Sequence, residues 1–367
     1  MRKKLPGLWF NEAIMKKWGH GMAELVVYEN SVTMNFTTKR KLANEAVFLI
    51  DRFWAFQKQE HDLVIPESNK FKTSVPEVYH YTWFGCRKFT LVHYLSMFSV
   101  LKNLVNAEKA KIVFHTDCEP NSVFWGKIKL AAGSMLIIQN VTVQDLGDCV
   151  LSKKECESKK YSPFIFWHAP KFSKIEHLSD IYRIYLLYRY GGIYLDDDMI
   201  LLKPHTEYLS STRLTLGQTS WASLANGFMI TPPKAPVLLK WLQEYKHYQP
   251  ILHGPYSVMK IMALSQEFPG DIRIIQSKWV RPSWKENELL YDDVGFDWSF
   301  SDNVHLGNRY LHRELTKRVN NSFEVVEDID CLNNVVGEMA RQILYGSYHL
   351  CGVDYKLRDV IYGANVD

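Results

Sequence analysis

The sequence predicts an α/β fold in which helices flank a mostly parallel sheet. Between residues 78 and 143, apolar strand candidates alternate with a helix candidate, and further along a long amphipathic helix runs directly into another apolar strand. A chain of 367 residues with 47% hydrophobic content is large enough to bury a sizeable core. Its formal charge of +4 is too small to indicate a dedicated nucleic-acid or membrane surface.

Polar, proline-containing sequence places a domain boundary near residue 74. Residues 1–74 are expected to form a partly helical N-terminal extension, because residues 42–57 have an amphipathic pattern and residues 65–77 carry two prolines. Residues 75–310 are expected to form the main domain. Residues 311–367 are expected to form a helical segment that packs on it.

The main domain opens with a regular order of elements. The patterns predict a strand at residues 78–85, a helix at 91–104 and strands at 111–117 and 134–143. Ligands of such sheets bind beyond the carboxyl ends of the strands, which makes Trp83, His115 and Asp117 candidates for a binding site. A purely structural role in the core is the alternative for each of them.

Residues 173–204 carry the most informative pattern. Ser173 and Glu176 form a capping-box pair that starts a helix, apolar residues then recur at helical spacing, and Gly191 with Gly192 ends it. Residues 193–195 read as a buried strand that runs into three consecutive aspartates. Three carboxylates at the end of an apolar strand repel one another, so their position favours a bound cation.

The alternation of side chains along a strand places Asp196 and Asp198 on one side and Asp197 on the other. The first two would form a clamp of hard oxygen ligands suited to Mn²⁺ or Mg²⁺. Asp180 and Arg183, three residues apart on one helix face, could reach the same place. The alternatives are a solvated acidic turn and a surface ion pair of little energetic value.

The six cysteines show no spacing typical of a zinc site, although Cys149 and Cys156 could close a small loop. Sequons at Asn35, Asn140 and Asn320 are compatible with a secretory compartment. No signal peptide or membrane anchor is evident in the sequence.

This pattern resembles the DXD-containing sugar-binding region of glycosyltransferase family 32, which includes galactosyl-, N-acetylglucosaminyl- and mannosyltransferases. The family signature is S-D-x-x-R followed by Y-x-x-G-G-x-Y-x-D-x-D. The matching residues here are Ser179, Asp180, Arg183, Tyr188, Gly191, Gly192, Tyr194, Asp196 and Asp198. The resemblance implies a GT-A (Rossmann-like) fold in which Asp198 ligates the metal, Asp196 holds the ribose and a metal-bound water, and Asp180 and Arg183 grip the donor sugar.

Weaker resemblances extend over residues 75–308. Residues 75–85 resemble the opening of the family domain, which implies that Trp83 lies against the nucleotide base. Asn226 and Gly227 resemble a loop near the donor sugar, and residues 254–255 resemble a later G-P turn. His305 resembles a histidine near the diphosphate and is expected among the metal ligands, although Gly307 replaces the tryptophan of the family motif.

The resemblance implies a retaining, metal-dependent transferase that moves a hexose or N-acetylhexosamine. We expect Mn²⁺ or Mg²⁺ as cofactor, a nucleotide-sugar donor, UDP-linked on resemblance, and a glycan, glycolipid or glycoprotein acceptor. No nucleic-acid partner is expected. The family mostly works in the Golgi lumen, which is therefore the expected location, with the cytoplasm as the alternative.

Two other functions compete with this prediction. A phosphatase of the haloacid dehalogenase type also places D-x-D after an apolar strand, with the first Asp as nucleophile. That class does not account for the Gly-Gly-x-Tyr sequence before the acids. The other alternative is a catalytically silent sugar-nucleotide-binding or scaffold protein with the same fold.

Overall fold

The computed structural model describes residues 23–28, 31–36, 74–141, 175–220, 223–245, 256–276, 278–282, 287–291, 297–307, 327–330 and 332–347. The chain divides into two compact units, Met1–Leu63 and Val64–Asp367, so the division precedes residue 74. In the first unit the described residues form an antiparallel hairpin of β1 (Ala23–Tyr28) and β2 (Ser31–Phe36). The helix expected at residues 42–57 lies outside the described residues.

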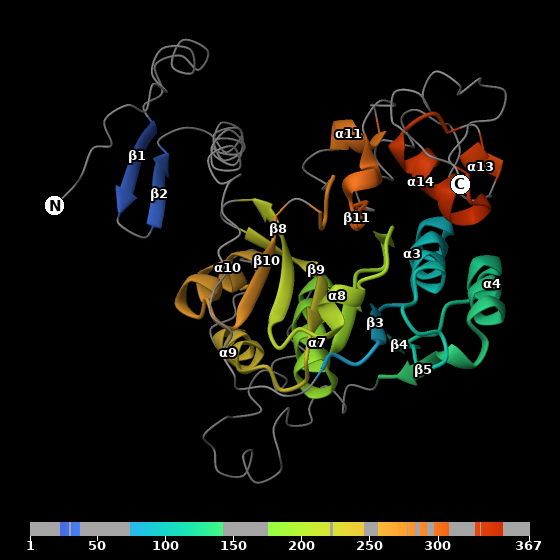
Figure 1. Ribbon diagram of the computed structural model, residues 1–367, viewed down its shortest axis with the longest axis horizontal. Coiled ribbons are helices and arrows are strands. Elements are labelled where there is room, and N and C mark those ends of the chain that lie inside the picture. Colours follow the sequence, from blue (N-terminus) through green and yellow to red (C-terminus); the bar gives the residue numbers. More distant parts are fainter. Residues whose placement is uncertain are drawn as a thin grey trace, which may run out of the picture. The chain divides into compact units, whose positions relative to one another are not determined.

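A seven-stranded sheet is the centre of the second unit (Figure 1). Its strand order is β10-β8-β9-β6-β3-β4-β5. The strands are β3 (Val78–Trp83), β4 (Lys111–Thr116), β5 (Leu136–Asn140), β6 (Gly192–Leu195), β8 (Leu214–Ser220), β9 (Ser223–Thr231) and β10 (Ile272–Ile275). Among these strands only β9 runs antiparallel to its neighbours, which confirms the predicted α/β class with a mostly parallel sheet.

The strand order changes direction at β3. From β3 the chain continues outward through β4 to β5, and the next strand, β6, pairs with the opposite side of β3. Such a switch point opens a crevice at the carboxyl ends of the two central strands, where α/β proteins bind their ligands. The acidic triplet follows β6 at this point.

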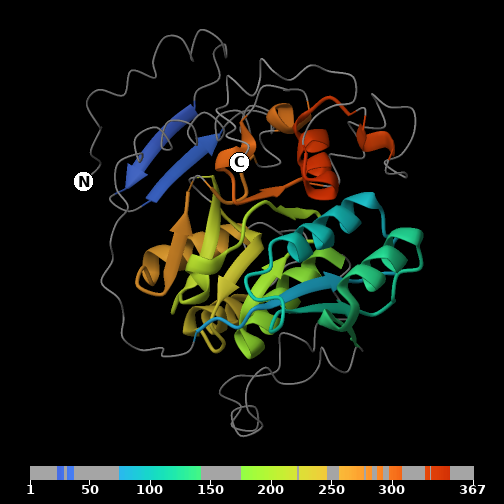
Figure 2. The same ribbon diagram turned by 45° about the vertical axis from the view of Figure 1, so that its right-hand side comes forward.

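Helices cover both faces of the sheet (Figures 1 and 2). Apolar residues of α3 (Leu91–Lys102) and α4 (Val123–Ala132) pack on one face, against alternate residues of β3 and β4. On the other face lie α7 (Ile175–Tyr190), α9 (Pro236–Glu244) and α10 (Val258–Glu267). Because strand side chains alternate, Tyr194 contributes to the second layer while Ile193 and Leu195 contribute to the first.

Shorter elements complete the unit. They are the 3₁₀ turns Gly133–Met135 and Trp298–Phe300, strands β7 (Met199–Leu201) and β11 (Asn303–His305), and helices α8 (Thr206–Leu209), α11 (Asn287–Tyr291), α13 (Glu327–Asp330) and α14 (Val335–Tyr345). β7 and β11 pair as a separate antiparallel ribbon, with His305 opposite Met199. The apolar face of α14 packs with α3 in a third core cluster. Within the described part of the chain, we find no helix with both the length and the apolarity needed to cross a bilayer.

Candidate metal and donor-binding site

A tight turn between α7 and β6 brings the S-D-x-x-R residues of the helix beside the D-x-D residues that follow the strand. Gly191 and Gly192 have φ angles of 66° and 105°, and the Gly191 N–H donates to Leu187 O at 2.9 Å, which closes the helix. Arg183 precedes this turn by about 12 Å along the helix, and Asp196 follows it by about 13 Å along the strand. The helix and the strand run back alongside each other, so these two side chains meet.

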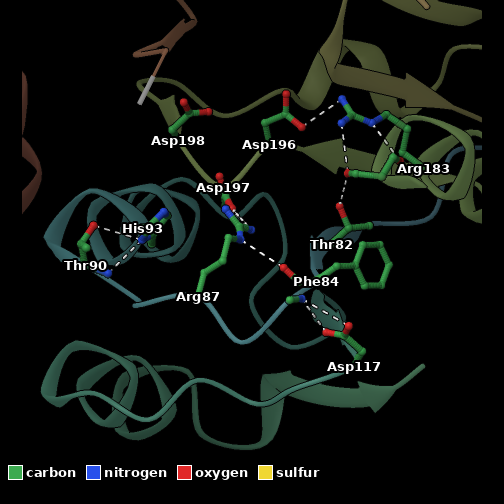
Figure 3. A network of polar contacts seen from close by, with 12 residues as sticks. Thr82, Phe84, Arg87, Thr90, His93, Asp117, Arg183, Asp196, Asp197 and Asp198 are labelled. Carbon is green, nitrogen blue, oxygen red and sulfur yellow. Dashed lines mark hydrogen bonds and ion pairs between the residues drawn. The ribbon is translucent and has the colours of Figure 1, made fainter. Parts of the chain in front are cut away.

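Arg183 is the central contact of the site (Figure 3). Its guanidinium lies 2.9 Å from the Asp196 carboxylate and 3.2 Å from that of Asp180, and it donates to the Asn226 carbonyl at 2.9 Å. Burial alone would lower the pKa of Arg183, but the nearby carboxylates outweigh it, so the pKa lies above its ordinary value. Arg183 therefore stays charged and holds the Asp196 carboxylate in position.

Asp180 is held by a side chain of β9. The Asn226 side-chain amide on β9 donates to Asp180 at 2.9 Å and to the Ser257 hydroxyl at 2.7 Å. Asp180, Arg183 and Ser257 are all buried, and Asn226 is nearly so, at 8% exposure. The candidate sugar-gripping residues thus form one connected polar network.

Hydroxyl groups continue this network toward β3. Tyr194 donates to the Asp196 carboxylate at 3.0 Å, and Thr82 lies 2.9 Å from the Tyr194 hydroxyl and 2.7 Å from the Ser179 hydroxyl. Ser179 also accepts from Arg183 at 3.1 Å. Ser179 and Tyr194 were predicted to contact substrate; in the structure they orient Asp196 and Arg183, and their contact with substrate stays a prediction.

Asp196, Asp198 and His305 form a cluster with the composition of a metal site. One ligand atom from each lies within 4.8 Å of the others. His305 Nε2 is 2.9 Å from Asp198 and 3.8 Å from Asp196, although the histidine comes from β11, far along the sequence. Two carboxylate oxygens and one imidazole nitrogen suit Mn²⁺ or a similar divalent ion, so the residues present fit the implied cofactor.

The electrostatics of this cluster also fit a cation. Burial raises the pKa of Asp196, against the opposing charges of Arg183 and His305. Burial lowers the pKa of His305, but the adjacent Asp198 carboxylate, followed by Asp196, raises it to about 9. The imidazolium proton of His305 thus supplies positive charge between the carboxylates, and a metal ion bound by all three residues would take its place.

Gly227 leaves room for the Asp196 carboxylate. A Cβ at this position would lie 2.5 Å from Asp196 Oδ2 and 3.4 Å from the His305 ring. The Gly227 carbonyl also accepts from the Asp196 N–H at 2.8 Å. A residue without a side chain is therefore required where β9 passes the end of β6.

Asp197 points away from the cluster, as predicted, but the strand geometry that we expected is wrong. β6 ends at Leu195, and Asp197 and Asp198 lie in a turn in which the Met199 N–H donates to the Asp196 carbonyl at 3.0 Å. The turn brings the Asp196 and Asp198 carboxylates to one cluster and directs the Asp197 carboxylate elsewhere. Asp197 pairs with Arg87 at 2.6 Å on the opposite side (Figure 3).

Trp83 lies at the end of β3, but its ring is fully buried, with 0% exposure. It packs against Phe89, His93 and Phe114, and the Arg87 guanidinium covers it at 4.0 Å from the ring centre. In this structure the ring presents no face to a ligand, so its expected contact with a nucleotide base stays a prediction.

The two other strand-end candidates have structural partners. His115 is buried and lies 3.1 Å from His80, whose other ring nitrogen lies 3.0 Å from the Gly191 carbonyl. Asp117 accepts from the Gly85 N–H at 2.9 Å. Residues 254–255 and Ser173 lie outside the described residues.

Sequence reasoning missed the residues that secure the loop after β3. A disulfide joins Cys86 to Cys118, which follow the adjacent strands β3 and β4. The adjacency of those two strands was the available signal, because it brings both cysteines to the same edge of the sheet. Cys149 and Cys156, the pair that we considered, lie outside the described residues. Thr82 and Arg87 belong to no sequence motif that would have marked them as residues of the site.

The comparisons with known proteins agree with this site. Residues 134–215 match the family described as "Glycosyltransferase sugar-binding region containing DXD motif". This segment contains Asp180, Arg183, Asp196 and Asp198.

Curated relatives match over limited stretches. An uncharacterised protein of Arabidopsis thaliana is 42% identical over 82 residues, 22% of this chain and 12% of the relative. Glucan organizing enzyme 1 of Cryptococcus neoformans var. grubii is 26% identical over 124 residues, 31% of this chain and 34% of the relative. The matched stretches thus span about a third or less of these relatives.

Solved structures with a similar arrangement are glycosyltransferases of low identity. PaToxG glycosyltransferase has a TM-score of 0.40 at 19% identity, covering 63% of this chain and 79% of that chain. Mouse xyloside xylosyltransferase 1 has a TM-score of 0.35 at 11% identity, covering 62% and 96%. The family match is the more specific finding, because residues 134–215 resemble a DXD-containing glycosyltransferase sugar-binding region and include the two aspartates of the cluster described above.

Proposed function

We propose that this chain transfers a hexose or N-acetylhexosamine from a nucleotide-sugar donor to a hydroxyl group of a glycan or glycoconjugate, with the help of a divalent metal ion. The observation that carries the proposal is the meeting of Asp196, Asp198 and His305 within 4.8 Å, at the carboxyl end of a central strand. UDP is the proposed nucleotide on resemblance, and Mn²⁺ the proposed ion.

Some residues of the site would bind the metal ion, and others would bind the donor sugar. Asp196, Asp198 and His305 would hold the ion, which supplies positive charge to offset the charge that develops on the departing diphosphate. Arg183 holds the Asp196 carboxylate in place through their ion pair at 2.9 Å. Asp180, oriented by Asn226, would accept hydrogen bonds from donor-sugar hydroxyls.

Retention of the anomeric configuration is the proposed outcome of the reaction. The acceptor oxygen bonds to the sugar carbon from the face that the leaving group vacates. The bond between that carbon and the phosphate oxygen breaks, and the acceptor proton passes to the leaving phosphate. No carboxylate of the described site is assigned as a covalent nucleophile. An inverted product anomer, read by NMR, would contradict this proposal.

The lumen of the secretory pathway is the proposed location. The Cys86–Cys118 disulfide supports it, because such bonds persist in oxidising compartments. The sequons and the family resemblance point the same way.

The test of the metal assignment is donor binding, read as a thermal shift with UDP-sugars and GDP-mannose, each with Mn²⁺ and with a chelator. Asp198→Asn should abolish the metal-dependent shift. Asp197→Asn is the matched control, since its carboxylate faces Arg87, and it should keep the shift. A shift that survives in Asp198→Asn would reject the metal assignment. No shift for the folded wild type would favour a catalytically silent scaffold.

A further inference from the structure

Among the residues that the structure describes, strand β5 is an edge of the central sheet. It pairs there with β4 alone, and its residues from Ile137 to Asn140 are exposed. Ile137 and Ile138 retain 41% and 38% of their accessible surface. An open edge that carries β-branched apolar residues is a template for pairing with another chain, and proteins usually protect such edges.

Asn140 closes this strand and begins the sequon Asn-Val-Thr. Its side chain is exposed, while the next residue, Val141, is 5% exposed and its N–H donates to the Thr116 carbonyl at 2.7 Å. The backbone is therefore anchored to β4 while the asparagine faces solvent. A bulky group on Asn140 would displace none of the described core.

Strand alternation and register show which face of the sheet carries Asn140. Side chains alternate along a strand, so Asn140 and Ile138 share one face, about 7 Å apart. Register pairing places Ile138 opposite Phe114 and Asn140 opposite Thr116. A large hydrophilic group on Asn140 would thus extend beside the exposed part of Ile138.

We propose that Asn140 is a site of N-linked glycosylation and that its glycan shields the β5 edge from self-association. This inference rests on the lumenal location proposed above, which the Cys86–Cys118 disulfide supports independently of any sequon. The co-reactant is a lipid-linked oligosaccharide diphosphate. Asn140 Nδ2 bonds to the first sugar carbon, the bond from that carbon to the phosphate oxygen breaks, and the lipid diphosphate leaves as one amide proton is lost.

The modification can be read directly on the full chain, produced in animal cells behind a cleavable signal peptide. Enzymatic removal of N-glycans in heavy-oxygen water converts each glycosylated asparagine into a labelled aspartate that peptide mass spectrometry detects. We expect label at Asn140 in the wild type and in Thr142→Ser, which keeps the sequon, and none in Thr142→Ala. Secreted wild-type protein without label at Asn140 would overturn the site. Donor binding is not part of this readout, so its outcome is separate from that of the proposed activity.

Shielding is tested on the same protein by light scattering before and after glycan removal. We expect the deglycosylated chain and Asn140→Gln to self-associate more than the glycosylated wild type. Adding Ile138→Thr should suppress that association, because it removes the exposed apolar group on the same face. Deglycosylated wild type that remains as monodisperse as the glycosylated protein would overturn the shielding role.

Discussion

The Asp196 carboxylate depends on a position that has no side chain. Gly227 lies where β9 passes the end of β6, and the space that a Cβ would need is filled by Asp196 Oδ2, 2.5 Å from that point. Arg183 and Tyr194 hold the same carboxylate from the other side, so it cannot withdraw without losing those contacts. The geometry of the cluster is therefore set by a residue that contributes no ligand atom.

Gly227→Ala should weaken Mn²⁺ binding on the order of 10- to 100-fold, the usual effect of disturbing groups that orient metal ligands. Isothermal titration calorimetry with Mn²⁺ would measure it. The matched control is Gly126→Ala in α4, where a Cβ meets nothing within 4 Å. This control should leave Mn²⁺ affinity unchanged and stabilise the helix by about 1 kcal/mol. Equal Mn²⁺ affinity in the two variants would show that Asp196 tolerates displacement.

At the scale of elements, the loop after β3 is secured at several points. The Cys86–Cys118 disulfide and the bond from the Gly85 N–H to Asp117 tie it to the end of β4, and Arg87 ties it to Asp197. Gly85 and Cys86 both have positive φ angles, 84° and 40°, and this conformation is costly for a residue with a Cβ. The disulfide compensates for this cost by restricting the unfolded chain.

Replacing both Cys86 and Cys118 with serine should lower the free energy of unfolding by about 4 kcal/mol, as expected for a loop of this length (sequence separation 32). Urea denaturation followed by tryptophan fluorescence would measure the loss. A reducing agent should destabilise the wild type more than the double variant. Equal stability of wild type and variant under oxidising conditions would contradict this prediction.

The order of elements was predictable from the sequence, because residues 78–117 alternate between strand and helix patterns and Gly191 and Gly192 mark the end of α7. The pairing of Asp196 with Asp198 followed from the motif. The turn at Asp197 and Asp198 was not predicted, because the acidic triplet was taken as a continuation of the strand. The Arg87–Asp197 pair was not predicted because it joins segments 110 residues apart. Trp83 shows the limit most clearly, since the same motif position fits either an exposed stacking ring or the buried ring observed here.

At the scale of the whole molecule, three buried histidines have lowered pKa values. Burial lowers the pKa of His80 to about 4 and that of His205 to about 3. Burial and the neighbouring charge of His80 lower the pKa of His115 well below its usual value. The folded protein therefore favours the neutral form of these residues, whereas the unfolded chain binds protons near pH 6.5.

The stability that these three histidines contribute should consequently be complete above about pH 6.5 and decline as the pH falls toward their folded-state pKa values. For His80 alone, with a folded pKa of about 4, the loss from about pH 7.5 to about pH 5 is about 2 kcal/mol. Urea midpoints at the two pH values would measure the decline. His80→Gln removes the titrating ring but keeps a donor for the Gly191 carbonyl, so it should show a smaller decline. An identical decline in both proteins would assign the acid sensitivity to other groups.

The pairing of β7 with β11 has a consequence for how the molecule is made. His305 reaches Asp198 only when β11 docks beside β7, and the two residues are 107 positions apart. Closing so long a loop is slow compared with forming the α7–β6 turn, whose partners are adjacent. During synthesis the acidic turn therefore emerges well before its histidine. The cation site is complete only after the chain through β11 has left the ribosome and folded, so the capacity to bind metal should mark the end of folding of this unit.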